Sequence, residues 1–101
     1  MDTIRETFIW QGLTIEVLHT PNWSETYRAT YGHALSHLQI STAGRAPLPI
    51  SATGYRSHFE SADNIEVQGG AVAYVQAWLE YAAQSPSWSE VHQKARQLSL
   101  F

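Results

Sequence analysis

Histidines are the first residues in this sequence that could do chemistry. The chain has five in 101 residues, and His33 and His37 stand four positions apart. On a helix this spacing would bring both imidazoles to one zinc ion, but the surrounding residues alternate as in a strand, where these positions lie about 13 Å apart. A closed zinc site needs three or four ligands, and the sequence has no cysteine. We therefore expect no metal and no other cofactor.

The stretch GYRSHF, residues 54–59, holds a second reactive group. Tyr55, Arg56 and His58 could stabilise a phosphorane and transfer protons in a small toxin-like endoribonuclease. Strand alternation, however, places Arg56 and His58 on the face opposite to Tyr55. We expect Tyr55 and Phe59 to face the core, with Arg56 and His58 outside. The endoribonuclease is kept as an alternative function, and the main prediction is that the protein is not an enzyme.

Aromatic and β-branched residues fill residues 7–20, and Gln11-Gly12 divides them. Glycine can supply the positive φ of a tight turn, so this segment predicts a β-hairpin. The apolar positions that alternate along its second arm are Leu13, Ile15 and Val17. These should be buried on one face, and Pro21 should end the strand.

Two further segments alternate in the same way and predict a third strand over residues 33–42 and an edge-like fourth strand over residues 55–61. Between them, residues 43–54 carry two prolines and two glycines, which indicates a turn. We expect residues 21–32 to form a loop or a short irregular turn. Residues 63–70 are expected to be a connector.

The periodicity becomes helical after Gly69-Gly70. One stripe of this helix would contain Val72, Val75, Leu79 and Ala82, with Ala71 and Trp78 alongside. A second helix is expected from about Trp88 to Gln97, because Pro86 suits a helix entry and Ser87 and Glu90 have the spacing of a capping box. The sequence thus predicts an α+β fold, in which an antiparallel meander sheet of three to four strands is followed by two C-terminal helices packed on one face.

The composition is typical of one folded domain, which we place at residues 1–96. It is 44% hydrophobic and 15% charged, well away from the composition of disordered chains. The net charge is −3 and the six basic residues are scattered, which argues against direct nucleic-acid binding. With no cysteine, no leader-like start and no apolar run of membrane-spanning length, we expect a cytoplasmic protein without membrane contact. The oligomeric state is left open.

The last five residues form a separate segment, residues 97–101, with the sequence QLSLF. It is similar at all five positions to the consensus motif by which bacterial proteins dock on the sliding clamp of DNA polymerase. The resemblance implies that Gln97 forms hydrogen bonds at one subsite and that Leu98 occupies a shallow depression. Leu100 and Phe101, which follow Ser99, would fill a hydrophobic pocket. The bacterial sliding clamp is therefore the predicted protein partner.

A competing interpretation packs the tail on its own domain. Trp88, Val91, Ala95 and Leu98 fall at helical spacing, so Leu98 could continue the apolar stripe of the last helix. Both roles could also hold in turn, with the tail packed on the domain until a clamp competes for it.

The body, especially PLPISATGYRSHF at residues 47–59, resembles small uncharacterised bacterial proteins from plasmid- or phage-rich gene neighbourhoods. Such an origin fits a small acidic protein that captures a host replication factor. We predict a protein interaction module that docks on the clamp as adaptor or inhibitor. A mobile-element inhibitor of a host defence protein is a further alternative.

Overall fold

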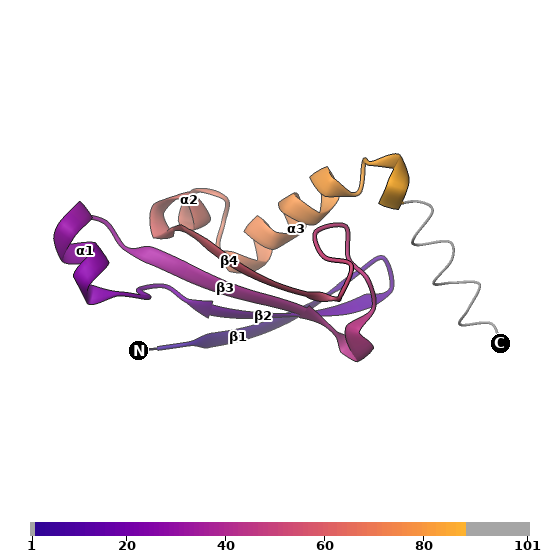
Figure 1. The fold of residues 1–101 in the computed structure, drawn as a ribbon, viewed down its shortest axis with the longest axis horizontal. Helices are drawn as coiled ribbons and strands as arrows, with labels where there is room; N and C mark the ends of the chain where they lie inside the picture. Colours follow the sequence, from indigo (N-terminus) through magenta and orange to yellow (C-terminus); the bar gives the residue numbers. More distant parts are fainter. Residues whose placement is uncertain (1, 89–101) are drawn as a thin grey trace.

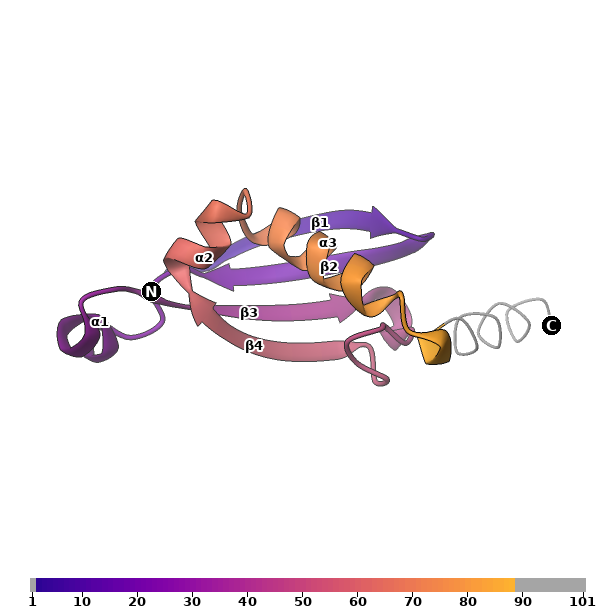
Figure 2. The ribbon, with the colours of Figure 1, turned by 90° about the horizontal axis from the view of Figure 1, so that it is seen from above.

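The structure is a computed structural model that describes residues 2–88. Its four strands form one antiparallel sheet in the order β1-β2-β3-β4, which is the predicted meander. The strands are β1 (Ile4–Trp10), β2 (Leu13–Thr20), β3 (Leu35–Thr42) and β4 (Tyr55–Ser61). Each strand pairs with its neighbour in sequence, so β1 and β4 lie at the two edges of the sheet (Figure 2).

The first hairpin forms where the sequence predicted it. Gln11 and Gly12 have φ values of 48° and 77°, both positive, as in the type I′ turns that match the twist of two paired strands. Strand β2 ends at Thr20, directly before Pro21. Proline has no backbone N–H for the ladder, which explains why pairing ends there.

Three complete α-helices and one short 3-10 helix connect or follow these strands in the described part of the chain. They are α1 (Glu25–Tyr31), η1 (Ala43–Arg45), α2 (Ala62–Val67) and α3 (Ala71–Ala82). Helices α2 and α3 cover one face of the sheet, and α1 lies beyond one end of it (Figures 1 and 2). The predicted α+β class, with helices packed after the sheet, is confirmed. Residues 86–88 are helical, and the rest of the expected second helix lies outside the described residues.

The segment at residues 21–32, expected to be a loop or irregular turn, contains helix α1 instead. Ser24 Oγ accepts a hydrogen bond from the Tyr27 N–H at 3.1 Å, which satisfies one of the unpaired N–H groups at a helix start. Gly32 ends the helix with φ 76° and donates its N–H to the Arg28 carbonyl at 2.9 Å. Because α1 has no buried residue, its sequence carries no apolar stripe that could have revealed it.

The connector expected at residues 63–70 was also wrong, since α2 occupies most of it. Ser61 Oγ accepts from the Asn64 N–H at 3.1 Å and so caps this helix. The helix is six residues long and buries only Ile65, so it is too short to show a helical period.

The hydrophobic core lies between the sheet and α3. Ile15 and Val17 of β2 are fully buried, as predicted, and Val75 and Leu79 of α3 are fully buried against them. The other core members are Trp10, Leu38, Ile40, Leu48, Ile65, Ala71 and Trp88. In residues 2–88, no helix is long and apolar enough to cross a membrane.

Strand β4 presents its faces opposite to the prediction. Its register places His58 beside Leu38, a core residue, so Arg56 and His58 face the helices. Tyr55 and Phe59 lie on the other face, 38% and 47% exposed. The reason is that β4 is an edge strand, so its inner face lies at the margin of the core. There His58 and Arg56 contact Tyr74 and Trp78 of α3, while the rings of Tyr55 and Phe59 lie on the uncovered face.

Candidate functional site

The predicted clamp-binding residues, Gln97–Phe101, lie outside the described residues. The described chain ends at Trp88, whose ring centroid lies 5.8 Å from that of Trp10 and whose exposed fraction is 7%. The Trp88 Nε1 group donates a hydrogen bond to Gln11 Oε1 at 3.4 Å. Trp88 therefore ties this part of the chain to the turn between β1 and β2.

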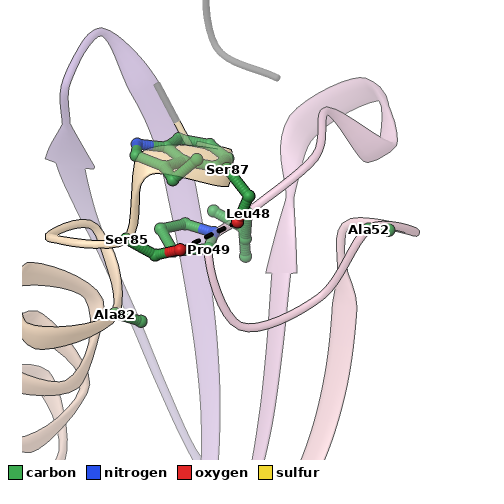
Figure 3. Close-up of a pocket in the computed structure, with 7 residues that line it drawn as sticks. Leu48, Pro49, Ala52, Ala82, Ser85 and Ser87 are labelled. Atoms are coloured by element: carbon green, nitrogen blue, oxygen red, sulfur yellow. Dashed lines mark hydrogen bonds between the residues drawn. The ribbon is translucent and has the colours of Figure 1, made fainter. Parts of the chain in front are cut away.

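A shallow pocket lies beside Trp88 (Figure 3). Its lining residues are Leu48, Pro49, Ala52, Ala82, Ser85, Ser87 and Trp88. The Ser85 and Ser87 hydroxyl oxygens are 2.8 Å apart and form a hydrogen bond at its margin. The lining groups are apolar or hydroxyl, so this pocket suits an apolar ligand better than acid-base chemistry.

The three residues considered for RNA cleavage do not share one site. Tyr55 lies on the uncovered face, where its hydroxyl donates to Gln39 Oε1 at 3.4 Å and the Arg45 guanidinium lies 5.3 Å from its ring centroid. Arg56 and His58 lie on the opposite face, toward α3. The predicted separation of Tyr55 from the other two is confirmed, although the faces are exchanged.

His58, Glu60 and Tyr74 form a hydrogen-bonded group, the helix-face cluster. The Tyr74 hydroxyl donates to Glu60 Oε2 at 3.1 Å, and the same hydroxyl lies 3.0 Å from His58 Nε2. A phenol has one proton to donate, so the second contact requires His58 to donate from Nε2. The cluster thereby selects the tautomer of His58 that leaves Nδ1 as the acceptor nitrogen.

Burial and hydrogen bonding set the protonation states of this cluster. The Ser61 backbone N–H, 2.8 Å from Glu60 Oε1, is the main reason that the pKa of Glu60 is lowered. Burial, together with donation to Glu60, raises the pKa of Tyr74 to about 12. Burial also lowers the pKa of His58. At neutral pH the cluster therefore contains a Glu60 carboxylate, a Tyr74 phenol and a neutral His58 imidazole. The carboxylate and the imidazole hold the phenol hydroxyl in a fixed orientation.

Trp78 covers the helix-face cluster from α3. Its ring centroid lies 4.5 Å from that of His58, and the guanidinium carbon of Arg56 lies 5.5 Å from the same indole. Arg56 Nη1 also donates to the Ile50 carbonyl at 3.5 Å. The cation of Arg56 thus stacks on an aromatic ring at the margin of the cluster.

The uncovered face carries a second group, the open-face cluster of Trp23, His37 and Phe59. The ring centroid of His37 lies 4.7 Å from the ring centroid of Trp23 and 4.6 Å from that of Phe59. His37 Nε2 forms a 2.6 Å hydrogen bond with Ser57 Oγ, and its Nδ1 atom is buried without a partner. Burial lowers the pKa of His37, so this imidazole is held neutral among rings.

Sequence reasoning missed most of these partners. Glu60 could have been found, because it alternates with His58 along β4 and must share its face. Tyr74 could not have been matched to His58, since their contact depends on how α3 lies on the sheet. Within residues 2–88, no three histidine, cysteine or acidic side chains lie close enough together to hold a metal ion.

Comparison with known families matches residues 3–88 to the KlcB third domain. The chain belongs to this family. The match covers every strand and helix from β1 to α3 and ends at Trp88, so the matched region does not include Gln97–Phe101. Membership indicates a plasmid-associated protein, which agrees with the mobile-element context predicted from the sequence. No curated protein and no solved structure matches the chain.

Proposed function

We propose that this KlcB-type protein is a non-enzymatic interaction module that docks on the bacterial sliding clamp through Gln97–Phe101, as adaptor or inhibitor. The observation that carries the proposal is the place of the motif relative to the family domain. The family match ends at Trp88, and residues 89–96 separate it from Gln97. A binding motif that follows a domain can be presented to a partner without disturbing the core of that domain.

The side chains of the motif suit a reversible contact. Burial of two leucines and one phenylalanine is worth roughly 5–8 kcal/mol before costs. Association and ordering of the segment offset a large share of this gain. A dissociation constant on the order of micromolar is the expected result.

The body supplies an attachment point for this motif. Trp88 is buried against Trp10 and bonds to Gln11, so the described part of the chain ends beside the β1–β2 turn. Helix α1 lies at the opposite end (Figure 1). The polar groups of the helix-face cluster bond to one another, which supports a structural role for these residues.

The direct test compares the full chain with a variant that lacks residues 97–101, using purified clamp on a biosensor surface. We expect deletion to abolish clamp capture and to leave the melting temperature unchanged. Leu100→Ala should weaken binding strongly, and the matched control Ser99→Ala should bind as the full chain does. Absence of binding by the full chain, together with a lower melting temperature after deletion, would show that the tail serves its own domain.

A second candidate function, the endoribonuclease, is favoured by one observation. Arg56 and His58 lie on the face of β4 that α3 covers, and Tyr74 of α3 supplies a phenol beside His58 that Tyr55, on the other face, cannot supply. Metal-independent RNA cleavage by the full chain, lost in His58→Ala, would establish this activity. A similar loss in Tyr55→Phe would contradict the assignment to the helix face. Inhibition of a host defence protein stays a prediction from the plasmid context alone.

A further inference from the structure

The outer edge of β4 is a hydrogen-bonding surface with no strand beside it in the described part of the chain. Strand β4 is last in the sheet order and pairs only with β3 (Figure 2). Edge strands are commonly protected by charged side chains, especially lysine, by proline or by a bulge. Strand β4, YRSHFES, has no lysine or proline, and its two charged residues, Arg56 and Glu60, have opposite signs. Such an edge can accept another strand.

The ladder with β3 shows which backbone groups point outward. The Thr42 N–H donates to the Gly54 carbonyl at 3.0 Å, and the Ala62 N–H donates to the Ala34 carbonyl at 3.0 Å. In an antiparallel pair, directly opposed residues alternate between bonded and non-bonded positions. The even-numbered residues of β4 therefore bond to β3, and the N–H and C=O groups of Ser57 and Phe59 point away from it.

The two ends of this edge are closed by the chain itself. Ser51 Oγ donates to the Tyr55 carbonyl at 2.5 Å, and the Ser61 N–H donates to Glu60 Oε1 at 2.8 Å. The accessible part of the edge is thus short and centred on His58. It offers the donors and acceptors of two residues, Ser57 and Phe59.

We propose that a second copy of this chain pairs with β4 in the antiparallel direction, with the twofold axis at His58. Ser57 of each copy then lies opposite Phe59 of the other, and these residues exchange backbone hydrogen bonds. Arg56 of each copy lies opposite Glu60 of the other. The two sheets become one continuous sheet of eight strands.

Charge complementarity identifies the occupant as a second copy. Arg56 stands two residues before His58 and Glu60 stands two residues after it, on the same face of β4. Self-pairing about His58 therefore creates two cross-strand pairs of opposite charge, which stabilise antiparallel sheets. Glu60 can take part while keeping its bonds to Ser61 and Tyr74, because a carboxylate has about four acceptor positions.

The other edge of the sheet lacks this symmetry. Pairing β1 with itself about Thr7 would place Arg5 opposite Ile9 and Glu6 opposite Phe8, with no pair of opposite charges. Arg5 already contacts Glu16 of its own chain at 3.5 Å. The proposal therefore concerns β4 and not β1.

Single-cysteine variants of the full chain can report the register between the two β4 strands by disulfide formation, because the sequence has no other cysteine. In the proposed register, residue 58 faces itself across the axis in a non-hydrogen-bonded pair, with Cβ atoms close enough for a disulfide. Under mild oxidation, His58→Cys should form a covalent dimer about tenfold faster than Ser57→Cys or Phe59→Cys, whose partners lie at diagonal positions. Preferential cross-linking at residue 57 or 59 would overturn the register.

Charge variants test the same contact without replacing His58. Sedimentation of the full chain over a range of concentrations should show reversible dimers. Arg56→Glu should weaken dimerisation by about tenfold, because it turns two attractive pairs into repulsive ones. The matched control Arg28→Glu, on exposed helix α1, changes the net charge equally and should dimerise normally.

Mixing Arg56→Glu with Glu60→Arg should restore dimers, since each mixed pair again joins opposite charges. A wild-type chain that stays monomeric at high concentration would overturn the proposal. Equal weakening by Arg56→Glu and Arg28→Glu would do the same, because the effect would then come from net charge alone.

Discussion

The two faces of the sheet use histidine in opposite ways. His58 on the helix face bonds to Tyr74, which bonds to the charged Glu60, so its environment is a chain of polar groups. His37 lies one strand away on the open face, between Trp23 and Phe59, with one side-chain hydrogen bond. The difference shows that the segment packed against each face of the sheet decides the role of the histidine on that face. Helix α3 brings a phenol to one histidine, and the loop after β2 brings an indole to the other.

The faces also differ in how much they hold the fold together. Val75 and Leu79 of α3 are fully buried against the helix face of the sheet. On the open face, Ile9 is 66% exposed and Phe59 is 47% exposed. We therefore expect stability to depend mainly on the helix face, and the open face to tolerate changes.

The largest effect should come from truncating a core residue of α3. Leu79→Ala is expected to lower the free energy of unfolding by about 2–5 kcal/mol, because it removes a fully buried side chain and leaves a cavity. The matched open-face change, Ile9→Ala, should cost less than about 0.5 kcal/mol. Urea unfolding followed by tryptophan fluorescence measures both. Equal losses would show that the open face is covered by another surface.

An intermediate effect is expected from the two tyrosines that lie on opposite faces. Tyr74→Phe removes the hydroxyl shared by His58 and Glu60 and should cost about 1–3 kcal/mol, because partly buried groups lose a hydrogen-bond partner. Tyr55→Phe removes an exposed hydroxyl 3.4 Å from Gln39 and should change stability by less than about 0.5 kcal/mol. Thermal unfolding of the two variants gives the comparison. A larger loss for Tyr55→Phe would reverse the assignment of the faces.

The smallest effect should be the pH dependence that the two histidines cause. Burial lowers the pKa of His37 and of His58 below the ordinary value of 6.5. As pH falls below this value, the unfolded chain binds protons before the folded chain does. The histidine contribution to stability is therefore complete above about pH 6.5 and is lost as pH falls toward the folded pKa values.

His37→Gln and His58→Gln should each reduce this loss, which chemical unfolding at several pH values between about 7 and 5 can measure. Burial alone lowers the pKa of His37 on the open face. Burial also lowers the pKa of His58, but the nearby charge of Glu60 acts in the opposite direction. Stability that increases on acidification through this range would contradict the neutral state of both rings.

Local patterns predicted the elements that are long or have a distinctive turn. Gln11-Gly12 gave the first hairpin its position, and the helical period after Gly70 located α3. Helices α1 and α2 were missed because both are short and their main signal is a single serine cap, at Ser24 and Ser61. One polar residue before a short segment does not by itself distinguish a helix from a turn.

The sequence by itself determined which residues share a face of each strand, because side chains alternate along any strand. Only the tertiary structure decided which face α3 covers, and so placed Arg56 and His58 toward the helix and Tyr55 and Phe59 away from it. The physical reason is that both faces of edge strand β4 combine apolar and polar parts of large side chains, Tyr55 and Phe59 on one face and Arg56 and His58 on the other. Burying either face would therefore give a similar free energy. Contacts between distant segments, such as Tyr74 with His58, then select one of them.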